Sequence, residues 1–276
     1  MTEKAPAPPP GLAPRAFLTA LTAIAWREAL RFWHQRARLF SALVRPLVWL
    51  LVFAAGFRAA LGLSIIPPYE TYITYETYII PGLCGMVLLF NGMQSSLSLV
   101  YDREMGSMRL LLTAPLPRWW LLFAKLLAGT MISIIQVYAF LAVAALFGIT
   151  TPALGYLAVL PALLVSGLML GALGLALSSL VKQLENFAGV MNFVIFPTFF
   201  MSTALYPLWR MAESSTLLRD ICAVNPFSHA VELIRFALYL QFNGWALLWT
   251  LLAFAVFSAA AIWGYDPARG MVRRKG

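Results

Sequence analysis

Residues 154–180 have the sequence LGYLAVLPALLVSGLMLGALGLALSSL, which contains no charged side chain. About 20 consecutive apolar residues are enough for a helix to cross the hydrocarbon layer of a membrane. The stretch therefore predicts a transmembrane helix. It decides the fold class, because a helix that is apolar on every side has to be surrounded by lipid or by other helices.

Five further apolar stretches approach or exceed the same length, at about residues 46–66, 78–100, 121–147, 187–208 and 245–265. The composition agrees with them: of 276 residues, 61% are hydrophobic and 11% are charged, and the mean hydropathy is +0.80. Soluble domains have roughly 25% charged residues. The sequence predicts an all-α polytopic membrane protein, with six transmembrane helices in residues 43–265.

Residues 15–42 predict an amphipathic helix that lies in the membrane interface. Apolar side chains recur at helical spacing along one face, and basic side chains occupy the other. The solvated face of an ordinary core helix is the alternative, but the position directly before a spanning stretch favours the interface. Residues 1–14 are proline-rich and predict a disordered tail. The apolar face has Trp26, Leu30, Trp33, Ala37 and Phe40, and the basic face has Arg27, Arg31, His34 and Arg38.

The distribution of lysine and arginine predicts the orientation. With the N-terminus in the cytoplasm, the outer connections hold four of the 20 basic residues, namely Arg58, Arg210, Arg219 and Arg235. The other sixteen (20 − 4) lie inside, Arg45 among them, in the connection before the first span. Basic residues concentrate on the cytoplasmic side of membrane proteins. We therefore expect both termini, including the basic tail at 266–276, to be cytoplasmic in a bacterial inner membrane.

The second predicted span contains polar side chains that lipid disfavours. Asn91 and Gln94 lie one turn apart, and Ser95 and Ser98 follow them. Such side chains are used at helix–helix interfaces, and they also line polar pathways. Both interpretations stand at this point.

The outer connection before this span has four tyrosines at intervals of three, Tyr69, Tyr72, Tyr75 and Tyr78. Tyrosine is enriched where a membrane meets water. The pattern predicts an aromatic belt at the outer surface, and contact with an amphipathic substrate is the alternative.

The connection at 101–118 holds an apolar triplet between charged residues. A loop exposed to water needs no such triplet, whereas a docking element for a cytoplasmic partner uses one. The residues concerned are Asp102, Arg103, Glu104, Gly106, Arg109, Leu110, Leu111 and Leu112.

Between the fifth and sixth spans, the apolar patch at 236–242 covers only about 10 Å as a helix. A re-entrant or interfacial segment is the solution open to such a patch. Glu232 and Arg235 lie three residues apart on a predicted short helix, where they can form a structural ion pair.

Sequence signatures of energy-converting chemistry are missing. There is no phosphate loop, no GxSxG, HExxH or EF-hand pattern, and no Cys/His cluster. We expect no catalytic, metal or cofactor site in this chain, and a disulfide between Cys84 and Cys222 is not favoured. No carboxylate lies well inside a span, and Glu185 is at a boundary, whereas ion-coupled carriers place ionisable residues in mid-membrane. A separate subunit should therefore supply the energy.

Two other functions remain to be weighed. A self-contained channel or secondary transporter would work without a nucleotide-binding partner. A membrane-embedded lipid-modifying enzyme would need clustered acidic and histidine residues, but the two histidines, His34 and His229, fall on opposite sides of the predicted topology.

Three groups of residues resemble the permease subunits of type-2 ABC exporters, the family of daunorubicin, nodulation-factor and capsule or teichoic-acid export permeases. The groups are YIIPG at 78–82, DREMGS with LTAPLPR within 102–118, and ALYPL at 204–208 followed by NPFSH at 225–229. Each group is weak alone, but all three fall in register with the predicted topology.

The resemblance implies roles for particular segments. Residues 15–40 would be the connecting helix, and 102–118 the coupling helix that docks in a groove of the ATPase, with force passed on near Glu104 and Arg109. Residues 206–240 would form two short re-entrant helices that include Tyr206, Pro207, Asn225 and Pro226. The family works as two permeases with two separately encoded ATPase subunits, which bind ATP and Mg. The expected function is export of an amphipathic or lipid-linked molecule.

Overall fold

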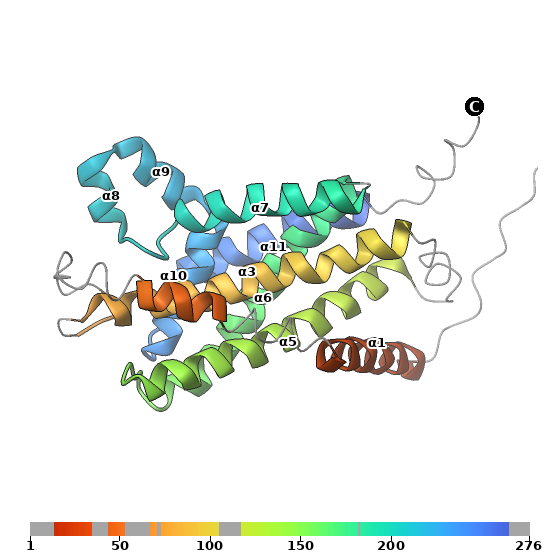
Figure 1. Cartoon of the computed structure of the whole chain (residues 1–276), viewed down its shortest axis with the longest axis horizontal. Helices are drawn as coiled ribbons and strands as arrows, with labels where there is room; N and C mark the ends of the chain where they lie inside the picture. The colour runs from red at the N-terminus through yellow and green to blue at the C-terminus, as the bar shows by residue number, and fades with distance from the viewer. Residues whose placement is uncertain are drawn as a thin grey trace, which may run out of the picture.

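Every regular element in the described part of the chain is an α-helix (Figure 1). This computed structural model describes residues 14–34, 44–52, 67–70, 73–104, 117–181 and 183–264. The helices are α1 (Pro14–His34), α3 (Tyr75–Glu104), α5 (Arg118–Leu146), α6 (Gly155–Leu180), α7 (Leu184–Phe200), α8 (Leu208–Ser214), α9 (Thr216–Val224), α10 (Pro226–Leu238) and α11 (Gly244–Gly264). Residues 44–52 are helical as well. The predicted helical class is confirmed.

Within the described ranges, four helices are long and apolar enough to cross a membrane: α3, α5, α6 and α11. Their bounds differ by no more than a few residues from the stretches predicted at 78–100, 121–147, 154–180 and 245–265. The protein is therefore a polytopic helical membrane protein. Only residues 44–52 of the region around the predicted first span are described, so the rest of that span lies outside the described residues.

The fifth predicted span, at 187–208, is wrong at its C-terminal end. Helix α7 ends at Phe200, and the chain is irregular from Met201 to Tyr206 before α8 begins. Hydropathy gives no signal for this break, because ALYPL continues the apolar run beyond Phe200. The side chains that stabilise the irregular backbone come from other helices, as described below.

Three short helices follow α7, where the resemblance implied two. Helices α8 and α9 pack chiefly on each other and stand at one end of the bundle, at the left of Figure 1. Helix α10 instead packs against α6, α11 and α3. It contains the first part of the apolar patch at 236–242, where Leu238 is buried, whereas Leu240 and Phe242 beyond its end are exposed.

Helix α3 is at the centre of the bundle. In its most apolar stretch 72% of the residues are buried, against 17% in that of α11. Its principal neighbours are α6, α5, α10 and α7. The exposed leucines and aromatic residues of α11 are what a lipid-facing helix presents.

Glycines permit the close crossing of α3 and α6. A Cβ atom on Gly92 would lie 3.0 Å from the Cα of Gly171, and one on Gly174 would lie 2.9 Å from the carbonyl oxygen of Gly92. Small residues at such crossings let two backbones approach without a driving force from water. An added Cβ on Gly167 or Gly171 would instead meet Thr130 or Leu126 of α5, at 2.6 and 2.5 Å.

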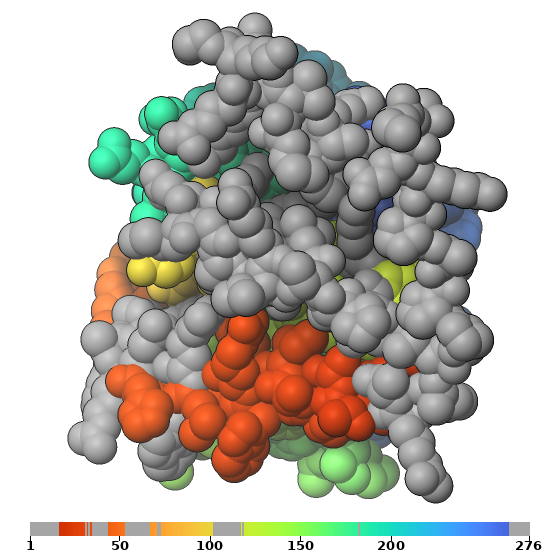
Figure 2. Space-filling view, turned by 90° about the vertical axis from the view of Figure 1, so that its right-hand side faces the viewer, coloured from red at the N-terminus to blue at the C-terminus, as the bar shows by residue number. Residues whose placement is uncertain are grey.

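Helix α1 lies at the other end of the bundle, where α3, α6 and α11 end and α5 and α7 begin (Figure 1). Figure 2 looks onto this end, and α1 runs across the lower part of the face. Its contact is with α5: the Trp120 indole N–H donates to the carbonyl oxygen of Phe17 at 3.2 Å, and the two rings meet edge to face.

We expect Gly92→Val to destabilise the bundle, because its side chain would meet the backbone of α6 and push the helices apart. Overpacking of this kind costs about 1–3 kcal/mol. The matched control is Gly189→Val in α7, where an added Cβ meets nothing within 4 Å. The thermal unfolding midpoint in detergent, followed by tryptophan fluorescence, should fall for Gly92→Val only. Equal midpoints for the two variants would contradict the tight crossing.

Candidate functional site: the polar side chains of α3 and the irregular segment after α7

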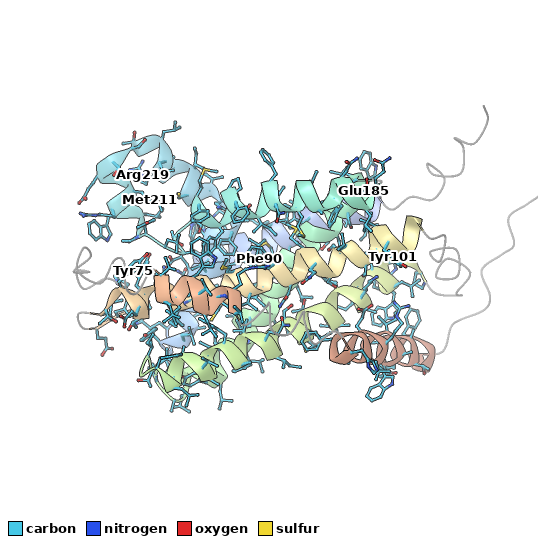
Figure 3. All side chains as sticks on the ribbon, in the orientation of Figure 1. Tyr75, Phe90, Tyr101, Glu185, Met211 and Arg219 are labelled. Atoms are coloured by element: carbon cyan, nitrogen blue, oxygen red, sulfur yellow. The ribbon has the colours of Figure 1, made fainter. Side chains whose placement is uncertain are left out.

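The four polar residues predicted on the second span lie on α3, which runs the length of the bundle (Figure 3). The structure does not bring them together as one lining. Asn91 is buried and its amide N–H donates to the Gln136 side chain of α5, while Gln94 is exposed on the surface of the chain. Ser98 donates to the carbonyl oxygen of Ser95, one turn earlier, at 2.7 Å. Asn91 therefore belongs to the interface between α3 and α5, whereas the Gln94 side chain lies on the surface of the chain.

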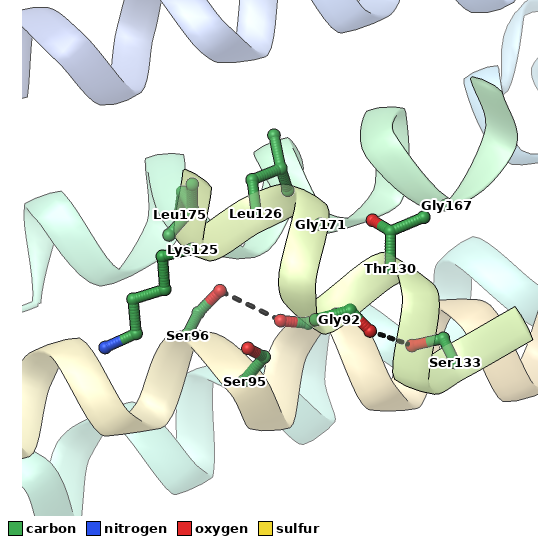
Figure 4. Close-up of a pocket in the computed structure, with 11 residues that line it drawn as sticks. Gly92, Ser95, Ser96, Lys125, Leu126, Thr130, Ser133, Gly167, Gly171 and Leu175 are labelled. Carbon is green, nitrogen blue, oxygen red and sulfur yellow. Dashed lines mark hydrogen bonds between the residues drawn. The ribbon is translucent and has the colours of Figure 1, made fainter. Parts of the chain in front are cut away.

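Ser95 lines a small polar cavity where α3, α5 and α6 meet (Figure 4). Hydroxyl groups and glycines surround the cavity, and the Ser96 and Ser133 hydroxyls donate to carbonyl oxygens one turn earlier at 2.9 and 2.8 Å. Its volume of about 10 Å³ has room for roughly one water molecule. A transported molecule does not fit in it.

Lys125 also lines this cavity, and its side chain is only 4% exposed. The sequence pattern counted it simply as one of the basic residues near the cytoplasmic surface. Its neighbour Leu126 lies against Gly171 of the facing helix, where an added Cβ would come within 2.5 Å of the leucine. Hydropathy gives no signal for this position, because a lysine near a helix end is ordinarily exposed.

The irregular segment between α7 and α8 is stabilised by hydrogen bonds from α3 and α10. The Tyr78 hydroxyl and the Arg235 guanidinium both donate to the carbonyl oxygen of Thr203, at 3.1 and 2.9 Å. The Tyr75 hydroxyl donates to the carbonyl oxygen of Leu205 at 3.0 Å. Backbone that leaves a helix within a membrane protein needs such partners, since lipid offers none.

Arg235 is the centre of this network. It is 2% exposed, pairs with Glu232, and places its guanidinium carbon 4.1 Å from the centroid of the Tyr78 ring. The predicted structural pair between Glu232 and Arg235 is confirmed. Sequence spacing indicated the pair, but it gave no indication that Arg235 is buried against α3.

The predicted aromatic belt is wrong for the three tyrosines that the structure describes. Tyr69, Tyr75 and Tyr78 are 4%, 2% and 2% exposed, so their rings lie inside the protein rather than at a membrane surface. The reason is the irregular segment after α7, because the Tyr75 and Tyr78 hydroxyls donate to its free carbonyl groups. Tyr69 packs edge to face on Tyr239. Tyr72 lies outside the described residues.

Asn225 joins α7 to α10. Its side-chain oxygen accepts from the Phe227 N–H at 3.0 Å and caps α10, and Pro226 follows at the first helical position. Its amide N–H groups donate to the carbonyl oxygens of Thr198 and Met201, at 2.8 and 2.6 Å. The NPF sequence thus fixes the end of α7 to the start of α10.

A wider groove opens beside this junction, at the end of the bundle where α8 and α9 lie. It has a volume of about 620 Å³, within the range of sites for small molecules. The lining combines apolar side chains with one carboxylate: Pro197, Thr198, Met201, Asp220, Ile221, Val224, Asn225 and Pro226. Of the predicted re-entrant residues, Asn225 and Pro226 line the groove, whereas Tyr206 and Pro207 do not.

Helix α1 exposes Trp26 and Leu30, which are 68% and 41% exposed, while Glu28 is buried and pairs with Arg27 at 3.4 Å. The side chain of Arg31 and the whole of Arg38 lie outside the described residues. The exposed tryptophan suits a helix in the interface, and the interfacial role stays a prediction.

Of the predicted docking residues, Asp102, Arg103 and Glu104 form the last turn of α3. Gly106, Arg109 and the leucines at 110–112 lie outside the described residues, so the docking element stays a prediction. Cys84 and Cys222 are both free thiols in buried positions. Over the residues that are described, no group of three or more His, Cys, Asp or Glu could hold a metal ion.

We expect Arg235→Met to destabilise the protein by about 3 kcal/mol, because Glu232 would lose its partner in a buried setting. Tyr78→Phe should cost only about 1 kcal/mol, since Thr203 keeps one of its two donors. Arg210→Met is the matched control: its pair with Glu213 is exposed and is worth at most about 1 kcal/mol. Thermal unfolding of the three variants checks the order, and an Arg235→Met variant as stable as the control would contradict the network.

Comparisons with known proteins identify a family and relatives of this chain. Residues 19–239 match the family described as ABC-2 type transporter. The putative transport permease ycf38 of Porphyra purpurea is 32% identical over 220 residues, which are 78% of this chain and 72% of the relative. The probable multidrug ABC transporter permease YbhR of Escherichia coli K12 is 28% identical, over 75% of this chain and 55% of the relative. Nodulation protein J of Rhizobium leguminosarum bv. viciae is 23% identical, over 76% and 79% respectively.

Proposed function

This chain belongs to the ABC-2 type transporter family, and we propose that it is the permease subunit of an ATP-driven exporter for an amphipathic or lipid-linked molecule. The observation that carries the proposal is the family match over residues 19–239, which includes α3, α5, α6, α7 and α10. A membrane permease component follows from the family itself. The direction of transport, the cargo and the coupling are the steps that we propose.

The energy source is a partner ATPase, which binds ATP and Mg. The sequence has no phosphate loop, and a permease of an ABC transporter needs a subunit that has one. We place the contact in the 101–118 connection, which follows directly from the last turn of α3. Because α3 packs on α6, α5, α10 and α7, a displacement of its C-terminal end would also displace these four helices.

A second copy of this chain completes the pathway. The polar cavity beside Ser95, where α3, α5 and α6 meet, has a volume of about 10 Å³, which is too small for a bulky solute. A two-fold pair can form the route between its subunits. We therefore propose two permeases with two ATPases.

The topology that we propose has six spans, with both termini in the cytoplasm of a bacterium. Helix α7, with 17 residues or about 26 Å, is at the short end of what crosses the hydrocarbon layer, and it serves as the fifth span. The helical residues 44–52 belong to the first span. Helix α1 lies in the cytoplasmic interface, and α8–α10 form the outer re-entrant region.

Co-expression with the ATPase encoded beside this gene tests the proposal. The pair should co-purify and hydrolyse ATP, and Glu104→Arg or Leu111→Asp should lower both by roughly tenfold or more, as loss of a docking hot spot does. Glu213→Arg is the control, a charge reversal in exposed α8 at the opposite end of the bundle. Assembly and hydrolysis left intact by both 101–118 variants would show that the coupling assignment is wrong.

A further inference from the structure

A positive charge lies half-way along the bundle. The guanidinium carbon of Arg45 is 3.9 Å from the centroid of the Phe90 ring. Phe90 is 15 residues from the start of α3 and 14 from its end, so about 21–23 Å from either end of the helix. Figure 3 shows Phe90 between Tyr75 and Tyr101, near the middle of the molecule. The sequence-based placement of Arg45 in a connection at the cytoplasmic surface is therefore wrong.

Arg45 differs from the other arginines whose side chains the structure describes. Each of the other four has a carboxylate partner, in the pairs Arg27–Glu28, Arg210–Glu213, Arg219–Asp220 and Arg235–Glu232. No carboxylate or hydrogen-bond acceptor among the described residues pairs with Arg45, whose contact is the face of Phe90. An arginine deep in a membrane is costly, and such residues ordinarily mark a pathway or pair with another group.

The surroundings of Arg45 provide polar donors on one side and apolar surface on the other. Arg45, Phe90, Asn91 and Gln94 line a cavity with room for about one water molecule (about 10 Å³) between α3 and the helical residues 44–52. Gln94 is exposed one turn along α3 and can donate from its amide. The same short helix exposes Val44, Val48, Leu51 and Val52, each by about half.

A guanidinium that stacks on an aromatic ring keeps its N–H edge available for a phosphate or carboxylate. We propose that Arg45, supported by Phe90 and Gln94, binds the anionic group of an amphipathic molecule whose apolar part lies along the exposed valines and leucine of residues 44–52. The headgroup of an ordinary membrane lipid lies at the surface, so an anion at this depth is one in transit. This inference rests on the proposed export function and assigns the cargo to amphipathic anions.

Two fluorescent probes with the same apolar body test the site. The first is 11-(dansylamino)undecanoic acid, which carries a carboxylate, and the second is its methyl ester, which is neutral. The full chain, purified in dodecyl maltoside, is titrated with each probe, and the dissociation constants are read from dansyl fluorescence. Wild type is compared with Arg45→Gln, Arg45→Lys and the control Arg210→Gln, which makes the same change of charge in α8.

Wild type and Arg210→Gln should bind the acid more tightly than the ester. Arg45→Gln should lose roughly tenfold in affinity for the acid, as expected for charge-assisted hydrogen bonds, with no change for the ester. Arg45→Lys should keep part of the preference. Unchanged ester binding shows that the Arg45→Gln fold is intact.

An Arg45→Gln variant that keeps the wild-type preference for the acid would overturn the anion site. So would a variant that dissociates into single chains in size-exclusion chromatography, since Arg45 would then be an interface residue. These results are independent of the ATPase. If the chain binds the acid through Arg45 but never assembles with an ATPase, the export proposal fails and the site stands.

Discussion

Hydrocarbon offers no hydrogen bond to a peptide group, and this constraint decides where the helices of this protein can break. The long helices α3, α5, α6 and α11 satisfy their backbone internally. The break after Phe200 exists only because other elements supply donors to it: Tyr75 and Tyr78 from α3 and Arg235 from α10 reach the carbonyl oxygens of Leu205 and Thr203. The irregular segment between α7 and α8 is therefore stabilised by side chains from distant parts of the sequence.

Helix α3 connects the regions that a transport cycle has to coordinate. One side meets α6 through Gly92, another reaches α5 through the bond between Asn91 and Gln136, and its first turns bond the irregular segment. Its last turn carries Asp102, Arg103 and Glu104 toward the connection that we assign to the ATPase. What remains of its surface at mid-depth is Phe90 and Gln94, next to an arginine. The same helix thus combines the packing centre, the proposed input and the proposed cargo contact.

Sequence patterns predicted much of the fold, because a hydropathy window measures what lipid selects for. The bounds of α3, α5, α6 and α11 came from it within a few residues. Sequence patterns failed where a side chain far away in the sequence decides where a helix ends or whether a residue is buried. The segment that follows α7 is bonded by Tyr75 and Tyr78, which lie 130 and 125 residues from their partners in the sequence. The same hydrogen bonds keep these two tyrosines buried. Arg45 looked like a surface charge because a charge count registers position along the chain and not depth. The spacing of Glu232 and Arg235 sufficed for their pair, since that contact is local.

The amide of Asn225 has a mechanical consequence. Its two amide N–H groups donate to carbonyl oxygens at the end of α7, and its side-chain oxygen accepts from the start of α10. These two helix ends are therefore bonded to the same side chain. Helices α8 and α9 pack chiefly on each other, and α9 has a smaller contact with α10. Because one side chain makes all three bonds, replacing Asn225 would release the end of α7 and the start of α10 at the same time.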